Sequence, residues 1–285
     1  MGLVSARMKV VRNAIIVGMP RSGTSLAAAT FVNKNYHVAV VTPSDLLTSN
    51  EANPFGYWEA KSMNNHNAAI LGAAGFPFHD TWMFDRITPE HVKNIYKLSP
   101  LPEHKAYLEA FERHRPWVWK DPRFCYTLAY WWPMMDPRTT GVLILRRDRA
   151  AIFRSFDRLD WRRPLAQGRE DFYARIDDHL AAAMDAIRTF DIPYIEIDYD
   201  EFLNAPEQVA RRLSDFFGIS VTSADLNVRP ELNHNYWRGR LAGVLRTVMR
   251  AVPTRAKRLV ARIVPQFVIE AIYPEKKLAR TIRDL

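Results

Sequence analysis

Two glycines five residues apart, Gly18 and Gly23, form the clearest chemical feature of the sequence. They belong to the segment GMPRSGTS at residues 18–25, which follows an apolar run and precedes a helical pattern. Glycines allow a tight turn whose backbone N–H groups point inward, and the positive end of the following helix adds to their attraction for anions. The segment is therefore predicted to bind a phosphate group.

The spacing in this segment matches the phosphate-binding loop GxxxxGK[ST], except that Thr24 stands in place of the lysine. Nucleotide kinases and ATPases use that lysine on the β- and γ-phosphates. Here the cation lies inside the loop, as Arg21. The alternative is an ordinary glycine-containing turn, which the strand–loop–helix context disfavours.

A second anion-binding pattern follows another apolar run. Residues 141–146 read GVLILR and lead into Arg147, and Ser155 lies eight residues after that arginine. Ligands gather at the carboxyl ends of strands in open α/β sheets, where an arginine can bind phosphate through two N–H groups and a serine can add a hydroxyl donor. Asp148 is predicted to cap the following helix. A surface helix whose arginines and aspartates pair with one another is the alternative.

Together the two patterns resemble the sulfotransferase family. The segment PRSGTSL is similar to that family's 5′-phosphosulfate-binding loop, and an arginine at a strand end with a serine eight residues later resembles its 3′-phosphate motif. The resemblance implies that the sulfuryl donor is 3′-phosphoadenosine 5′-phosphosulfate, with Arg21 facing its bridging oxygen. It also implies the donor contacts: Arg21, Ser22, Gly23, Thr24 and Ser25 around the 5′-phosphosulfate, and Arg147 and Ser155 on the 3′-phosphate.

Similarity to bacterial sulfotransferases extends over residues 13–235. Arg149 stands where the family often has proline, and residues 229–240 do not match the GxxGxxK segment that closes the nucleotide site of the cytosolic enzymes. The resemblance therefore leaves the residues that contact the adenine unassigned. Further similar segments are NPFGYWE at 53–59, WVWKDPR at 117–123, and residues 197–218.

Sulfuryl transfer requires a base for the acceptor proton, fixed cations for the charge that grows on the leaving phosphate, and in-line alignment. Arg21 and Lys120 are the candidate cations, and Lys120 ends a short aromatic run. The transferred group is neutral and resembles SO3, so no metal ion is predicted.

The base is harder to identify. In cytosolic sulfotransferases a histidine follows a similarly placed lysine and acts as the base, whereas Asp121 follows Lys120 here. Related enzymes that act on sugars and tyrosine use a glutamate from this part of the chain, so the resemblance makes Glu59 the first candidate. His66 and His79 are alternatives as the base, although a solvated or capping role is favoured for each histidine.

Four tryptophans lie in segments expected to face the acceptor: Trp58, Trp82, Trp131 and Trp132. Aromatic faces suit sugars and lipid-like molecules, so the predicted acceptor is a hydroxyl of a carbohydrate or glycolipid. Core packing is the favoured interpretation for Trp131 and Trp132.

Apolar runs alternate with helical patterns along the chain, which is typical of a parallel sheet covered on both faces. We therefore predict an α/β, three-layer P-loop NTPase-like fold around a central parallel sheet of about five strands. The predicted strands are residues 13–18, 36–41, 116–120, 141–146 and 193–197, and the predicted helices are residues 24–34, 62–74, 103–113, 149–159, 172–190 and 206–217.

The C-terminal fifty residues differ from the rest. The formal net charge is +9, and residues 236–285 contain 12 Lys/Arg and 3 Asp/Glu, so residues 1–235 are balanced and give no reason to expect nucleic-acid binding. We predict a sulfotransferase domain at 1–235 and a basic helical extension at 236–285. Within 237–264, apolar residues fall on one helical face with arginines and lysines between them, as in helices that lie on an anionic membrane. A helix packed on the domain, or a tail that binds RNA or another polyanion, is the alternative.

The single cysteine, Cys125, and the absence of an apolar leader predict a cytoplasmic protein, with membrane association through the extension. Two other functions stay open: a P-loop nucleotide kinase or ATPase, and a non-catalytic nucleotide-binding module on a membrane surface.

Overall fold

The computed structural model describes residues 10–38, 42–49, 53, 56–76, 87–158, 168–226 and 228. The chain divides into two compact units, Met1–Val228 and Arg229–Leu285. The predicted basic extension lies outside the described residues, as do His79 and Trp82. The boundary near residue 235 and the membrane-binding helix therefore stay predictions.

Four parallel strands form the central sheet, in the order β2-β1-β3-β4. Because every neighbouring pair of strands is parallel, crossover connections are required, and helices supply them. In the register, Ile16 of the central strand β1 lies beside Lys120 of β2 and Leu143 of β3. The predicted α/β architecture is confirmed. The strands are β1 (Asn13–Val17), β2 (Val118–Lys120), β3 (Thr140–Arg146) and β4 (Tyr194–Asp198).

The strand predicted at residues 36–41 does not form in the described part of that run, which ends at Val38. His37 makes only an isolated parallel bridge to Trp117. Asn35, at φ 62°, turns the chain just before this run. Only one residue then pairs with the edge of the sheet, so the described sheet has four strands.

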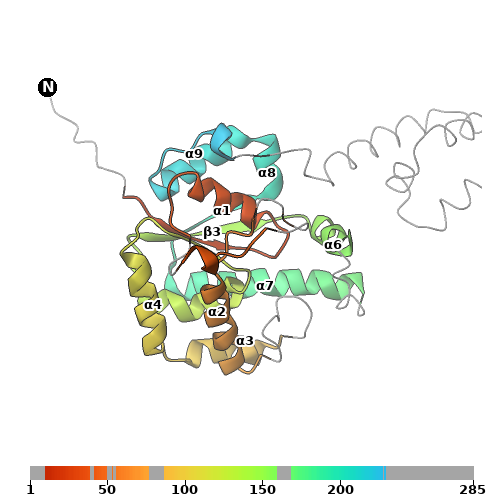
Figure 1. Ribbon diagram of the computed structural model, residues 1–285. Helices are drawn as coiled ribbons and strands as arrows, with labels where there is room; N and C mark the ends of the chain where they lie inside the picture. The colour runs from red at the N-terminus through yellow and green to blue at the C-terminus, as the bar shows by residue number, and fades with distance from the viewer. Residues whose placement is uncertain are drawn as a thin grey trace, which may run out of the picture. The chain divides into compact units, whose positions relative to one another are not determined.

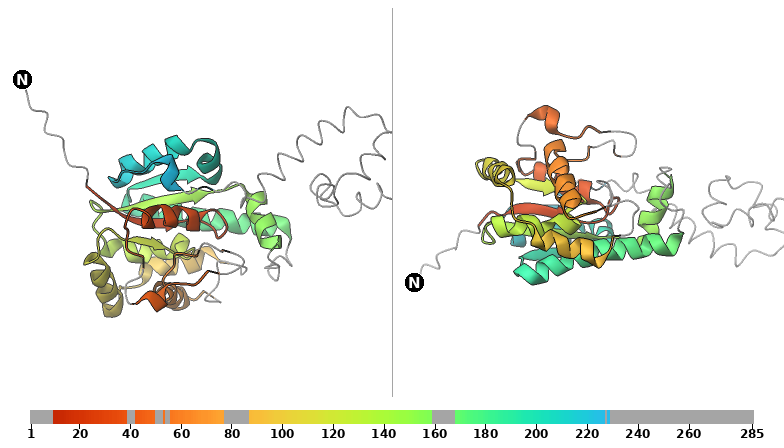
Figure 2. Two further views of the ribbon diagram at one scale, coloured as in Figure 1. Left: turned by 45° about the horizontal axis from the view of Figure 1, so that its top comes forward. Right: turned by 90° about the horizontal axis from the view of Figure 1, so that it is seen from below.

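Helices cover both faces of the sheet (Figures 1 and 2). One face is covered by α1 (Thr24–Val32), α8 (Tyr199–Asn204) and α9 (Pro206–Phe217). The other face is covered by α2 (Lys61–Ala73), α3 (Pro89–Lys97), α4 (Pro102–Glu112), α5 (Phe124–Trp131) and α7 (Arg169–Phe190), while α6 (Arg149–Arg158) follows β3.

In the part of the chain that the structure describes, none of the helices has the length and hydropathy needed to span a membrane.

The central strands β1 and β3 are mostly apolar because helices bury both of their faces. Ala14 and Ile16 of β1 pack in one core together with Phe31 of α1, whereas Ile15 and Val17 belong to the core on the other side. Alternate residues of one strand thus hold the two helical layers in place, and the carboxyl end of the strand is fixed between them.

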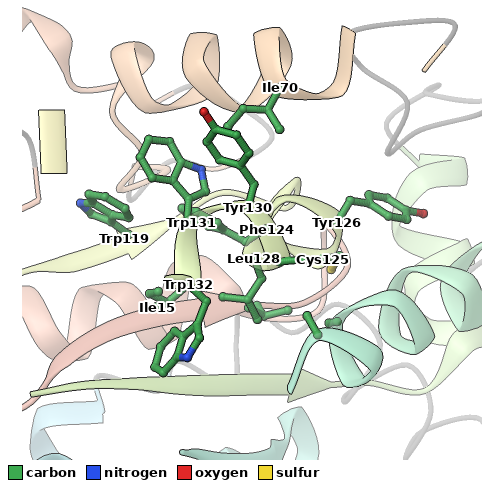
Figure 3. Packing of buried hydrophobic residues seen from close by; sticks show 14 of the residues in the cluster. Ile15, Ile70, Trp119, Phe124, Cys125, Tyr126, Leu128, Tyr130, Trp131 and Trp132 are labelled. Atoms are coloured by element: carbon green, nitrogen blue, oxygen red, sulfur yellow. The ribbon is translucent and has the colours of Figure 1, made fainter. Parts of the chain in front are cut away.

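The core beneath α5 is rich in aromatic rings (Figure 3). Trp119 stacks on Phe124 with centroids 6.0 Å apart, and Trp131 meets Trp119 edge-on at 5.4 Å. Trp131 and Trp132 are 0% and 5% exposed. The core-packing interpretation of these two tryptophans is confirmed, so they are not surfaces for an acceptor.

Three helices were not predicted: α3, α5 and α8. All residues of α5 are buried, so it lacks the one-sided apolar pattern by which an amphipathic helix is found. α8 has only six residues. α3 begins at a capping box in which Thr88 Oγ1 accepts from His91 N and His91 Nδ1 accepts from Thr88 N.

Candidate active site

The predicted functional residues meet at the carboxyl edge of the sheet. The phosphate-binding loop follows β1, Lys120 ends β2, and Arg147 follows β3. Parallel strands bring these three points to one edge, which is where ligands bind in open α/β sheets. In the register of the sheet, Ile16 of β1 lies beside Lys120 of β2, so Lys120 lies level with the last residues of β1, next to the start of the loop.

The loop at 18–25 has the backbone that its glycines suggested. Arg21 and Gly23 have positive φ, 68° and 98°. A Cβ on Gly23 would lie 2.3 Å from the Tyr199 ring, and one on Gly18 would lie 2.8 Å from Ser22 Oγ. Ser22 is 1% exposed, and its Oγ has no hydrogen-bond partner among the described residues. The loop therefore presents a buried hydroxyl and the start of α1 to an anion.

The two predicted phosphate sites are neighbours. Arg21 Nε donates to Ser155 Oγ at 3.0 Å, and Arg147 Nη1 donates to Arg21 O at 2.7 Å. The Arg147 guanidinium lies over the Tyr199 ring, 4.1 Å from its centroid. Asp148 accepts from Ala151 N at 2.8 Å, which confirms it as the cap of α6. Two arginines and a serine thus converge from the loop after β1, the end of β3 and helix α6.

The predicted base and the second cation are also brought together. Lys120 Nζ forms an ion pair with Glu59 Oε1, and the two residues are 5% and 7% exposed. Asn64 Nδ2 donates to the other carboxylate oxygen, Glu59 Oε2, at 3.0 Å. The Tyr57 ring lies 5.9 Å from Lys120 Nζ. A charged pair this deeply buried is costly unless its hydrogen bonds are satisfied, and Asn64 supplies one of them.

The segment that carries Glu59 is fastened at several points. Trp58 has φ 56°, which is rare for a bulky residue. Leu47 N donates to Glu59 O at 2.8 Å, and Asn53 Nδ2 donates to Ser25 Oγ at 2.9 Å, which links the segment to the phosphate-binding loop. The Trp58 ring is partly buried against the core that contains α1. That tryptophan therefore has a packing role that the sequence did not predict.

A buried polar network holds the turn after Lys120. Asp121 accepts from Asn67 Nδ2 at 2.9 Å and from Arg123 N and Nη1 at 2.9 and 3.0 Å. Asn67 Oδ1 in turn accepts from Thr127 Oγ1 and Trp131 Nε1, each at 2.8 Å. Asp121 is 0% exposed. Since α2 and α5 both join this network, the end of β2 is rigid.

His66, the alternative base, lies elsewhere on α2. Its ring packs 4.8 Å from His104 and 4.5 Å from Tyr107, centroid to centroid. Burial lowers its pKa below the ordinary value of 6.5. These aromatic neighbours lie against a different face of α2 from the face that carries Asn64. We therefore assign His66 to packing.

Sequence reasoning missed Asn64 and Asn67. They lie three residues apart on α2, a spacing that puts both on one face of a helix. That spacing alone is a weak signal, because two asparagines without a known partner indicate no particular function. Within the described ranges, no group of three or more His, Cys, Asp or Glu side chains is arranged to hold a metal ion.

Comparison with known proteins identifies the family. A model described as the sulfotransferase family matches residues 14–223, which includes both predicted phosphate sites and the Glu59–Lys120 pair. A search of curated proteins finds no match.

Three solved structures are similar at low identity. The sulfotransferase domain of the Synechococcus PCC 7002 olefin synthase is 18% identical, covers 78% of each chain and has a TM-score of 0.42. The sulfotransferase domain from the curacin biosynthetic pathway is 15% identical, covers 76% of this chain and 77% of that one, and has a TM-score of 0.42. A sulfotransferase from Alicyclobacillus acidocaldarius is 16% identical, covers 82% and 90%, and has a TM-score of 0.38.

Proposed function

This chain belongs to the sulfotransferase family, and we propose that it transfers a sulfuryl group from 3′-phosphoadenosine 5′-phosphosulfate to an acceptor hydroxyl. One observation carries the choice of donor. Arg21, in the loop suited to a 5′-phosphosulfate, is bonded directly to Ser155 and through its carbonyl to Arg147. A nucleotide with anionic groups at both its 5′ and 3′ positions fits such adjoining sites.

In the proposed reaction the acceptor oxygen attacks the sulfur, and the S–O bond to the leaving phosphate breaks. The electron pair of that bond stays on adenosine 3′,5′-bisphosphate, where Arg21 and Lys120 stabilise the growing negative charge. Glu59 takes the proton of the acceptor hydroxyl. Both carboxylate and lysine are nearly excluded from water, so each acts strongly on a nearby charge.

The Glu59–Lys120 ion pair gives the proposal a specific consequence. Lys120 is bonded to the base in this structure. To stabilise the leaving phosphate, its ammonium group has to turn toward the donor. The same movement frees one oxygen of Glu59 for the acceptor. Donor binding and the availability of Glu59 to accept a proton are then coupled through Lys120.

For the acceptor we propose a carbohydrate or glycolipid hydroxyl. The Tyr57 ring lies close to Lys120, and an aromatic face there suits a sugar ring. We further propose a cytoplasmic protein that binds anionic membranes through residues 237–264. Deleting residues 236–285 should abolish sedimentation with anionic liposomes, and salt should weaken the binding of the full chain. Equal sedimentation of both chains would remove the extension from the proposal.

The donor is tested by thermal shift with the full chain. Adenosine 3′,5′-bisphosphate should raise Tm more than adenosine 5′-monophosphate, ATP or GTP at the same concentration, because the ligand that binds the folded state more tightly stabilises it more. Transfer of radiolabelled sulfate to carbohydrate acceptors then tests the reaction. A larger shift with ATP or GTP would support a nucleotide kinase or ATPase. Nucleotide binding without transfer to any acceptor would support a binding module.

A further inference from the structure

Asn64 occupies the side of the Glu59 carboxylate that Lys120 leaves open. Its Nδ2 donates to Glu59 Oε2 at 3.0 Å, while Lys120 holds Oε1. An ionised carboxylate only accepts hydrogen bonds, so the amide must turn its NH2 group toward Glu59. The direction of this hydrogen bond is therefore fixed by chemistry.

The amide is carried by a rigid element. Asn64 lies in the first turn of α2, whose start is bound by Asp45: Ser62 N and Ser62 Oγ donate to its two carboxylate oxygens at 2.8 and 2.6 Å. One turn further along, Asn67 Nδ2 donates to the buried Asp121 at 2.9 Å. Because α2 is held on both sides of Asn64, the backbone that carries the amide is fixed in place.

Lys120 and Asn64 must behave differently during the proposed reaction. The ammonium group of Lys120 is attracted by the donor phosphate and leaves Glu59. Asn64 is neutral and has no comparable attraction to the donor. Once Lys120 has turned, the Asn64 amide is the side-chain partner that keeps Glu59 in place within the described part of the chain.

We propose that Asn64 is a positioning residue, which holds the Glu59 carboxylate toward the acceptor hydroxyl after Lys120 has engaged the donor. The inference rests on the proposed function, because it takes Glu59 as the base. It predicts an effect on turnover and on its pH dependence, with no effect on donor binding.

The chain offers a matched control. Asn65, the next residue on α2, is exposed. Asn64→Ala should lower kcat about 10- to 100-fold, as for loss of a hydrogen bond to a charged group, with the KM for the donor unchanged. The acidic limb of the kcat/KM profile should move to higher pH, because the ionised carboxylate has lost a donor. Asn65→Ala should keep the wild-type values.

Asn64→Asp keeps the size of the side chain and sets a like charge against Glu59. It should move the acidic limb further than Asn64→Ala does. Wild-type kcat and an unmoved acidic limb in either Asn64 variant would overturn the inference. An equal loss in Asn65→Ala would do the same, because the effect would then belong to the helix.

A measurement independent of activity separates this inference from the proposed function. The Tm shifts of Glu59→Ala and Asn64→Ala should not add in the double variant, whereas those of Glu59→Ala and Asn65→Ala should. Additive shifts for the first pair would exclude the contact whatever the reaction is. If the wild type transfers no sulfuryl group to any acceptor, the proposed function fails, and the contact is still decided by this cycle.

Discussion

The proposed donor side and the proposed acceptor side of the site are built in different ways. The donor side consists of the loop at 18–25, Arg147 and Ser155, all within about ten residues of a strand end. The acceptor side pairs Glu59 with Lys120, 61 positions away in sequence, and with Asn64 on α2. Backbone turns shape the first, whereas side chains from separate elements assemble the second.

The two sides are therefore held in shape by different kinds of interaction. The loop at 18–25 keeps its shape through positive φ values and close backbone contacts. The Glu59–Lys120 pair depends on hydrogen bonds, which single substitutions remove. We therefore expect changes on the donor side to act on affinity, and changes on the acceptor side to act on turnover.

The largest effect is expected at Glu59. Glu59→Gln keeps the shape and the hydrogen-bonding reach of the side chain but removes its basicity. It should lower kcat about 10²- to 10⁴-fold, the range for loss of a general base. Affinity for adenosine 3′,5′-bisphosphate, measured by calorimetry, should change little, because Glu59 contacts Lys120 rather than the phosphate-binding loop.

His66→Ala is the control for the identity of the base. It should retain most of the wild-type kcat, because His66 packs among aromatic rings. A Glu59→Gln variant with wild-type turnover, beside an inactive His66→Ala or His79→Ala that still binds the donor, would move the base to a histidine. Loss of donor binding in Glu59→Gln would instead make Glu59 a structural partner of Lys120.

The next effect is expected at Arg147. Wild type should prefer adenosine 3′,5′-bisphosphate over adenosine 5′-monophosphate, and Arg147→Ala should reduce that preference by about 2–3 kcal/mol, as for a charge-assisted hydrogen bond. Arg146→Ala is the matched control, because Arg146 is exposed and pairs with Glu196 on β4. Calorimetric titration of both nucleotides measures the preference. Equal affinity of the wild type for the two would exclude the assigned donor.

The smallest effect is expected from metal removal. The transferred group is close to neutral SO3, and arginine and lysine side chains meet the charge on the leaving phosphate. Radiolabelled sulfuryl transfer should therefore continue in excess EDTA, whereas P-loop phosphoryl transfer requires Mg²⁺. Loss of activity that magnesium restores would favour the kinase alternative.

The sequence alone predicted the architecture and the proposed donor side. Apolar runs alternating with helices predicted the parallel sheet, and the spacing of residues 18–25, 147 and 155 predicted two anion sites at its edge. These features are local, since a glycine turn or a strand end is encoded within about ten residues. The helix α5 was missed for the corresponding reason, because a fully buried helix has no periodic pattern.

The arrangement of the proposed acceptor side is visible in the folded chain and not in the sequence. The sequence offered Glu59 by resemblance and Lys120 by its place at a strand end, but it did not show that they pair, or that Asn64 holds the second oxygen. It also left Trp58 as a surface aromatic, whereas the ring packs on a core. Such contacts depend on the packing of α2 against α5 and on its bond to the turn after β2. Packing joins residues whose distance along the chain carries no information about their distance in space.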